Sequence, residues 1–181
     1  ARGFWFLEYF GHEDVHVLDG GLNAWREAGL PLSADPVDPE RTKFDASRKV
    51  PDRLAGADTI LGVLGDPGVC ILDTRSDDEY TGKLVRAARG GAIPGSIHIE
   101  WTNNLDGEGR FKSGADLKAL YEARGVTPEK IIIPYCQGGY RSAHAYLALR
   151  LIGYPHIRNY VGSWKEWGDH AELPIETPAR P

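Results

Sequence analysis

The sequence predicts an α/β fold in which a central parallel β-sheet carries helices on both faces. Three observations indicate this fold class. Short apolar runs follow turn-forming residues, helical patterns separate these runs, and a glycine-rich loop stands where the most apolar run ends. Strands that are separated by helices pair in parallel, because each crossover brings the chain back to the same edge of the sheet.

Two strands are predicted in the first part of the main domain. Residues 69–72 form a short apolar run after the turn at 66–68, and residues 96–99 follow the turn at 94–95. Both runs have the length and the flanking residues of buried strands. In the second run His98 alternates with two isoleucines, which predicts an exposed strand position rather than a catalytic one.

The elements that follow alternate between helix and strand. Residues 116–124 have helical spacing and Gly125 marks the end of that helix. The strand at 131–135 is apolar without interruption, so we expect it to be buried on both faces. A second helix is predicted over 142–152, after which Gly153 stops it. Ligands of such sheets bind beyond the carboxyl ends of the strands.

The two ends of the chain resemble each other. The segment Gly20–Trp25 lines up with Gly162–Trp167 at an offset of 142 residues, and Gly11 then falls on Gly153. Leu30-Pro31 matches Leu173-Pro174 after one added residue. The shared pattern predicts a helix that ends at glycine, a short strand, a turn and a helix anchored by tryptophan. Trp164 and Trp167 are accordingly predicted to be core residues.

This repeat predicts three segments. Residues 1–33 would be the closing part of a preceding domain, whose counterpart of Cys136 would fall just before residue 1. Residues 34–47 have the proline-rich, polar composition of an interdomain linker, and residues 48–181 would be the main domain. The alternative is that residues 1–33 are an N-terminal helix of a single domain.

Composition excludes several classes of protein. The net charge of −5 and the mixing of both signs give no basic stripe for a nucleic acid, and no apolar run approaches the length of a membrane span. The two cysteines are too few for a disulfide scaffold, and no Cys/His spacing fits a metal site. Free thiols favour a reducing compartment, so we expect a cytoplasmic location.

The loop Cys136–Arg141 carries the chemistry. A cysteine at a strand end, followed by two glycines and a helix, meets backbone N–H groups that converge on one point. The helix N-terminus and the charge of Arg141 favour the thiolate, which is the nucleophilic form. Cys70 stands between apolar residues of a strand and is predicted to be an inert core residue.

These features together resemble the rhodanese family. The resemblance rests on Leu72–Ser76 with Glu79-Tyr80, on Gly91–Ser96, on the loop Cys136–Arg141, and on the ending Gly162–Trp167, which is typical of the second domain of tandem thiosulfate sulfurtransferases. The resemblance implies a three-layer rhodanese-like domain at 48–181 and the end of another at 1–33.

The resemblance also implies an activity and its residues. Cys136 would take a sulfur from an anionic donor such as thiosulfate, become a persulfide, and pass the sulfur to cyanide or a thiol. Gln137, Gly138, Gly139, Tyr140 and Arg141 would form the cradle of this site. Arg75 would bind the donor, or else form a structural ion pair with a nearby acid. No cofactor is implied, and the partners would be the donor, the acceptor and the preceding domain.

Several alternatives remain at this stage. Some thiosulfate-using relatives have a lysine where this chain has Gly138, so positive charge would have to come from Arg75 and Arg141. Mercaptopyruvate-using relatives show a different loop, but that donor stays an alternative.

Cysteine phosphatases of this fold have five residues between cysteine and arginine, whereas this loop has four. A non-catalytic regulatory module is the remaining alternative, against which the presence of Cys136 argues. The stretch with Lys83, Arg86 and Arg89 is interpreted as a solvated loop.

Overall fold

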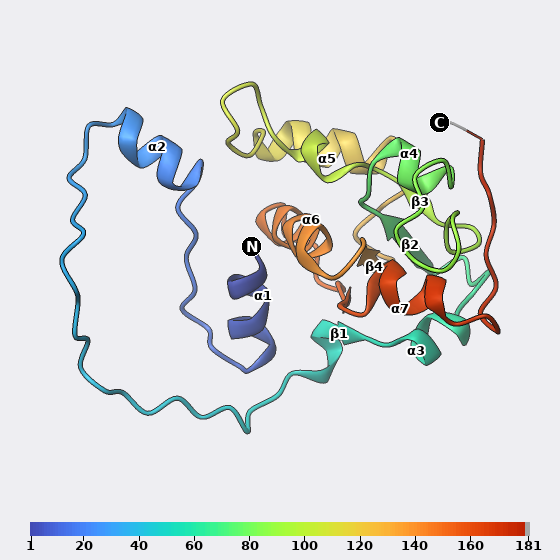
Figure 1. Cartoon of the computed structure of the whole chain (residues 1–181), viewed down its shortest axis with the longest axis horizontal. Coiled ribbons are helices and arrows are strands. Elements are labelled where there is room, and N and C mark those ends of the chain that lie inside the picture. The colour runs from blue at the N-terminus through green and yellow to red at the C-terminus, as the bar shows by residue number, and fades with distance from the viewer. Residues whose placement is uncertain (180–181) are drawn as a thin grey trace.

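A parallel sheet lies at the centre of the main domain (Figure 1). β2 (Val69–Asp73) lies between β3 (Ile97–His98) and β4 (Ile131–Tyr135), and both pairings are parallel. β1 (Leu54–Ala55) pairs in parallel with β5 (Asn159–Tyr160), and a parallel bridge between Ile132 and Ile157 links this pair to β4. The computed structural model describes residues 1–179, so the last two residues of the predicted 48–181 domain lie outside the described residues.

Helices connect and flank these strands. In chain order they are α1 (Arg2–Tyr9), α2 (Gly21–Glu27), the 3₁₀ turn η1 (Pro51–Arg53), α3 (Ala57–Leu61), α4 (Asp77–Tyr80), the 3₁₀ turn η2 (Trp101–Asn104), α5 (Gly114–Glu122), α6 (Tyr140–Leu151) and α7 (Ser163–Asp169).

Each face of the sheet has its own hydrophobic core, because successive side chains of a strand point to opposite faces. Leu72 and Ile132 pack with residues of α5 and α6 on one face. Ile71 and Ile133 pack on the other face with residues of α3 and α7. Trp164 and Trp167 of α7 are also in this second core, at 1% and 0% exposure. The predicted three-layer α/β architecture and the two core tryptophans are therefore confirmed.

The two predicted helices of the main domain begin two residues earlier than their sequence patterns suggest. α5 begins after Ser113, whose hydroxyl accepts a hydrogen bond from the Asp116 N–H at 3.1 Å and so caps the helix. α6 begins at Tyr140, directly after Gly139, which has a left-handed φ of +84°. Gly125 and Gly153, which were predicted to stop these helices, have φ values of +74° and +81°.

The predicted exposure of His98 is wrong. Its side chain is buried, stacks on Tyr80 with 4.5 Å between the ring centroids, and places Nε2 2.9 Å from the Arg75 carbonyl oxygen. β3 has two residues, and the segment that carries α4 covers this side of it. Alternation predicts which residues share a face, but it does not show what other segments cover that face.

The N-terminal helix α1 packs against α6. Trp5 is buried and its indole N–H donates to the Arg53 carbonyl at 2.8 Å. Glu8 accepts hydrogen bonds from the Tyr146 hydroxyl at 2.5 Å and from Arg150 Nη2 at 3.0 Å. These contacts attach residues 1–11 to the main domain.

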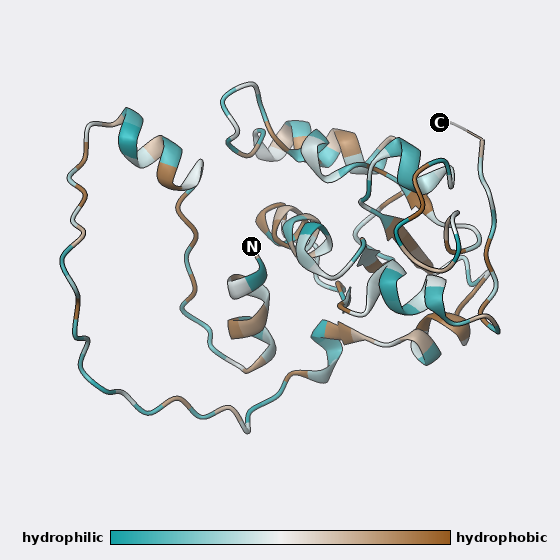
Figure 2. Ribbon diagram, in the orientation of Figure 1, coloured by the Kyte–Doolittle hydropathy of each residue, from teal (hydrophilic) through white to brown (hydrophobic). Residues whose placement is uncertain are grey.

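The chain then leaves the main domain in a wide arc that carries α2 (Figure 1). Residues 12–18 form no strand, so the short strand predicted here is wrong, since a strand needs a hydrogen-bonded neighbour and no described strand lies beside this segment. Residues 34–47 are exposed throughout. Figure 2 shows hydrophobic stretches along the arc. Leu32 and Val37 belong to this part of the chain and are exposed.

The aligned segments at the two ends of the chain share local geometry. The Trp25 indole N–H donates to the Pro31 carbonyl at 2.9 Å, and the Trp167 indole N–H donates to the Pro174 carbonyl at 2.7 Å. Gly21 and Ser163, which the offset aligns, have φ values of +57° and +55°. The aligned pattern thus encodes the same turn and the same indole hydrogen bond twice.

Among the helices of residues 1–179, none combines the length and the apolar character that crossing a bilayer requires.

Candidate active site

Cys136 is the first residue after β4, at the carboxyl end of the parallel sheet. This is the edge at which the sequence places it, and where open α/β sheets bind ligands. Cys136 is 1% exposed, so its thiol is covered by the loop that follows.

The loop folds back so that a backbone N–H group faces the sulfur. The Gly139 N–H lies 3.2 Å from Sγ of Cys136. Gly139 adopts its positive φ here, and a Cβ at this position would meet the Val161 carbonyl oxygen at 3.0 Å. Glycine is therefore needed at position 139 for both conformation and space.

The first turn of α7 holds the loop from the other side. Cys136 N–H donates to the Ser163 hydroxyl at 3.1 Å, and that hydroxyl donates to the Tyr160 carbonyl at 2.7 Å. The N–H of Trp164 donates to the Cys136 carbonyl at 2.9 Å, and the N–H of Lys165 donates to the Gln137 carbonyl at 3.0 Å. The backbone on both sides of the sulfur is thus fixed by hydrogen bonds.

These surroundings favour the thiolate of Cys136. Burial of the thiol opposes ionisation, but the N–H groups of Ser142 and Gly138 and the charge of Arg141 outweigh it and lower its pKa from the ordinary value of 9.0. For Cys70, burial in the core raises the pKa to about 12. The two cysteines therefore differ in the direction in which their surroundings shift the pKa of the thiol.

The side chain of Arg141 is held by an ion pair. Its guanidinium forms a bidentate pair with Glu79 of α4, with Nη1–Oε2 at 2.5 Å and Nη2–Oε1 at 2.8 Å. Glu79 also accepts from the N–H of Ser76 at 3.2 Å as part of a capping box. Arg86 Nη1 lies 3.5 Å from Glu79 Oε1, so this residue of the predicted solvated loop is part of the site.

Arg75 forms the structural ion pair, which is the second of the two alternatives that the sequence leaves open. Arg75 is 1% exposed, and its Nη2 lies 2.5 Å from Asp73 Oδ2. The same nitrogen donates to the Gly91 carbonyl at 2.7 Å, and the guanidinium lies over the ring of Trp164 at 4.5 Å. The guanidinium is therefore enclosed within the fold.

The remaining cradle residues are arranged around the loop. Gln137 Nε2 donates to the Arg86 carbonyl at 2.7 Å, which joins the loop to the segment after α4. No atom beyond its chain neighbours would approach a Cβ at Gly138 within 4 Å, so open space adjoins it. Tyr140 is 66% exposed, and the guanidinium carbon of Arg2 lies 3.9 Å from the centroid of its ring.

Sequence reasoning missed the roles of Ser163, Glu79 and Arg86. Ser163 and Glu79 stand in motifs that the resemblance uses, but a motif does not show which side chain reaches the cysteine. Arg89, from the same loop as Arg86, donates to the carbonyls of Gly168 and Leu173 and so stabilises the end of α7. Contacts over such sequence separations depend on the tertiary fold.

The arrangement suits a covalent mechanism. A thiolate in a tight N–H cradle can attack an electrophilic sulfur, and the same donors can stabilise the anionic outer sulfur of a persulfide. No group of three or more His, Cys, Asp or Glu side chains in the described part of the chain is arranged to hold a metal ion.

The sequence matches a known family and several curated proteins. The family model described as the Rhodanese-like domain matches residues 57–170. The chain is 38% identical to the thiosulfate sulfurtransferase of Azotobacter vinelandii over 176 residues, which cover 97% of this chain and 65% of that protein. It is 36% identical to the sulfur carrier protein TtuD of Thermus thermophilus, with coverage of 97% and 66%. The chain thus spans slightly less than two thirds of the length of these relatives.

The fold also superposes on solved structures of enzymes with related sequences. The anaerobic ergothioneine biosynthesis enzyme from Chlorobium limicola, in complex with trimethyl histidine, superposes with a TM-score of 0.90 at 28% identity. That match covers 98% of this chain and 45% of the enzyme. A variant of EanB with ergothioneine linked covalently to a persulfide cysteine superposes with a TM-score of 0.87, again at 28% identity, over 98% of this chain and 45% of that one.

Proposed function

Because this chain belongs to the rhodanese-like family, we propose that it is a sulfurtransferase that moves a sulfane sulfur through a persulfide on Cys136. The donor is a small anion, with thiosulfate favoured, and the acceptor is cyanide or a thiol. The observation that carries the proposal is the sulfur of Cys136. This sulfur lies at the carboxyl end of β4 and accepts a hydrogen bond from the Gly139 N–H at 3.2 Å. The pKa of the Cys136 thiol is lowered.

The first half-reaction loads the cysteine. The Cys136 thiolate attacks the outer sulfur of thiosulfate, a new S–S bond forms, and the bond to the sulfonate sulfur breaks. Sulfite leaves with the electron pair of that bond, and the anionic outer sulfur of the new persulfide takes the place of the thiolate charge. The loop N–H groups, which are fixed before reaction, stabilise this anion without reorganisation.

The second half-reaction removes the outer sulfur from the Cys136 persulfide. The carbon of cyanide, or the sulfur of a thiolate, attacks the outer sulfur, and Cys136 leaves as the thiolate. With cyanide the product is thiocyanate, and no proton, electron or metal is consumed in either step. Alternation of donor and acceptor at one sulfur is ping-pong chemistry.

The relatives support this proposal without fixing the substrate. One is named a thiosulfate sulfurtransferase and another a sulfur carrier protein. A solved relative carries a cysteine persulfide. The chain covers less than two thirds of the curated relatives, and their activities support the class of chemistry.

The donor is the open part of the proposal, with 3-mercaptopyruvate as the alternative to thiosulfate. The test is to compare kcat/KM for the two donors with cyanide as acceptor. Thiosulfate should be preferred, and release of pyruvate at a higher kcat/KM than release of sulfite would assign the chain to the alternative. Failure of both donors to load Cys136 would instead favour a non-catalytic regulatory module.

We also propose that residues 1–33 close a first rhodanese-like unit, that 34–47 form the linker, and that 48–181 are the catalytic unit, with the first unit as partner. The paired indole hydrogen bonds of Trp25 and Trp167 and the matching φ values of Gly21 and Ser163 support the repeat. Limited proteolysis tests the linker: first cuts should fall within the exposed residues 34–47, and resistance there would contradict the assignment.

A further inference from the structure

The proposed donor is an anion, but the two arginines nearest the loop are already neutralised. Arg75 is paired with Asp73 inside the fold, and Arg141 is paired in a bidentate manner with Glu79. Gly138 has no side chain at the position where some relatives have lysine. Arg86 shares the Glu79 carboxylate with Arg141, so one excess positive charge remains on that side. Further positive charge for an anionic donor therefore has to come from the other side of the loop.

A cavity of about 470 Å³ adjoins Gly138 on the side of α7. Its lining comes from the start of α1, from the loop, and from β5 and α7, and consists of Arg2, Gly138, Val161, Gly162, Lys165, Glu166, Asp169 and His170. Gly138 makes the Cys136–Arg141 loop part of this lining.

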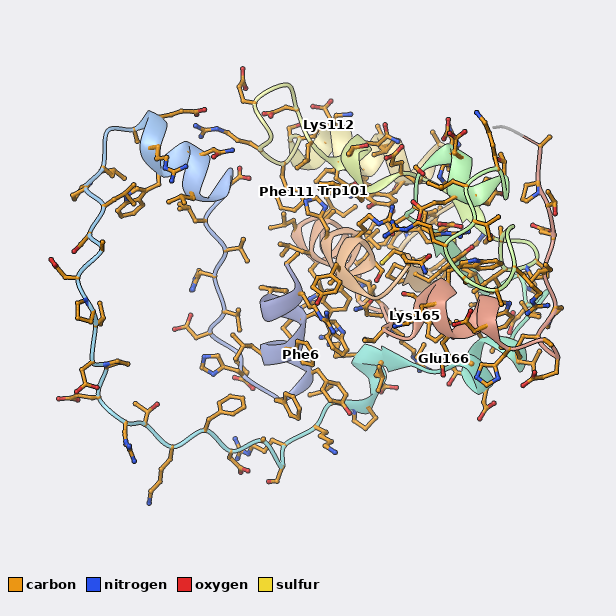
Figure 3. All side chains as sticks on the ribbon, viewed as in Figure 1. Phe6, Trp101, Phe111, Lys112, Lys165 and Glu166 are labelled. Atoms are coloured by element: carbon orange, nitrogen blue, oxygen red, sulfur yellow. The ribbon has the colours of Figure 1, made fainter. Side chains whose placement is uncertain are left out.

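Two cations of this cavity have no acidic partner among the described residues. Lys165 is exposed on α7, next to Glu166 (Figure 3), and its backbone N–H donates to the Gln137 carbonyl, which fixes it beside the loop. The guanidinium carbon of Arg2 lies over the ring of Tyr140, 3.9 Å from its centroid. A guanidinium that stacks on an aromatic ring keeps its in-plane N–H donors for a ligand.

The other charged groups that line the cavity are engaged elsewhere. Asp169 Oδ1 accepts the Ala88 N–H at 2.7 Å, and His170 Nδ1 lies 2.8 Å from Glu172. The carboxylate of Glu166 lies against Gly162, where a Cβ would come within 1.7 Å of Oε2. Glu166 and Asp169 both limit the positive charge of the cavity, but neither forms an ion pair with Lys165 or Arg2.

We propose that Lys165 and Arg2 form the subsite that binds the sulfonate oxygens of the anionic donor while Cys136 attacks its outer sulfur. The proposal rests on the sulfur-transfer function proposed above and names the residues that select the donor. Arg2 belongs to the segment 1–33, so that segment supplies a substrate-binding group to the catalytic domain.

Donor binding can be measured without turnover in a Cys136→Ser background, because that variant cannot form the persulfide. We expect thiosulfate to bind with a Kd about tenfold weaker when Lys165→Gln or Arg2→Gln is added, since each removes one charge contact. Lys118→Gln, on the exposed face of α5, is the matched control and should leave the Kd unchanged. Lys165→Arg should retain most of the affinity.

Turnover gives the second readout. In the wild-type background, Lys165→Gln and Arg2→Gln should lower kcat/KM for thiosulfate by about tenfold and leave kcat/KM for a neutral dithiol acceptor unchanged. Unchanged thiosulfate binding in both variants would overturn the subsite, as would a loss confined to Arg86→Gln. Thiosulfate that binds as predicted but never loads the wild-type cysteine would contradict the proposed function and leave the anion subsite standing.

Discussion

Arg141 and Glu79 join the cysteine loop to α4 through two parallel hydrogen bonds, of 2.5 and 2.8 Å. The carboxylate is nearly inaccessible to solvent and the guanidinium is partly exposed. Burial of Glu79 alone would raise its pKa, but the hydrogen bonds and charge of Arg141 and the N–H of Ser76 outweigh burial and lower the pKa to about 2. The pair therefore stabilises the loop that carries Cys136.

Glu79→Gln should destabilise the protein at neutral pH by about 3 kcal/mol, because it leaves Arg141 without a counter-charge in a partly buried site. Urea unfolding measures this difference. Glu122→Gln is the matched control, since its ion pair with Lys118 is exposed and should contribute less than about 1 kcal/mol.

The same pair predicts a pH dependence. A carboxylate with a lowered pKa stabilises the folded state above its unfolded pKa and loses this effect as the pH falls toward its folded pKa. The stability difference between wild type and Glu79→Gln should thus be full above pH 4.5 and shrink between pH 4.5 and about 2. A difference that stays constant over this range would show that the ion pair is not its source.

Arg75→Lys separates a structural from a donor-binding role. Lysine cannot reproduce the contacts of the guanidinium with Asp73 and Gly91, so we expect a loss of about 3 kcal/mol in thermal or urea unfolding. At temperatures where the variant is folded, KM for thiosulfate should change less than about twofold. A large rise in KM with unchanged stability would assign Arg75 to the donor after all.

Ser163 allows a comparison of two substitutions. Both Ala and Gly remove the hydroxyl that accepts the Cys136 N–H, which should cost about 1–3 kcal/mol. Glycine also relieves the positive φ of +55° that an L-residue adopts there. Ser163→Gly should therefore be more stable than Ser163→Ala by about 1 kcal/mol in urea unfolding. Equal stability of Ser163→Ala and wild type would contradict this account.

The sequence predicts the features that depend on local pattern. The strand before Cys136, the helix after it and the core positions of Trp164 and Trp167 follow from apolar runs, glycines and spacing. The arrangement of the sheet follows from strand–helix alternation. These features are set by residues that are near one another in the chain, so a single sequence contains the information.

Other features depend on which distant segments meet. The pairing of Arg75 with Asp73 rather than with a ligand, and of Arg141 with Glu79, is decided by side-chain directions in the folded core. His98 is buried because the segment with α4 covers β3, which strand alternation does not report. Lys165 and Arg2 line one cavity beside the loop although 162 residues of chain lie between them, and no motif links the two.

The two cysteines should react at different rates with iodoacetamide. Only thiolates are alkylated at an appreciable rate, the pKa of Cys136 lies below 9.0, and that of Cys70 is raised to about 12. Peptide mapping after a short reaction at neutral pH should find the label at Cys136, with a rate that rises with pH and is half-maximal below pH 9.0. Equal labelling of both residues would contradict the predicted environments.

The central claim is that Cys136 carries the transferred sulfur, and intact-protein mass spectrometry after incubation with thiosulfate tests it most directly. Wild type and Cys70→Ser should each gain the mass of one sulfur atom and lose it when cyanide is added, with formation of thiocyanate. Cys136→Ser should gain no mass and form no thiocyanate. If Cys136→Ser still acquires sulfur and turns over, Cys136 is not the carrier and the mechanism described above is wrong.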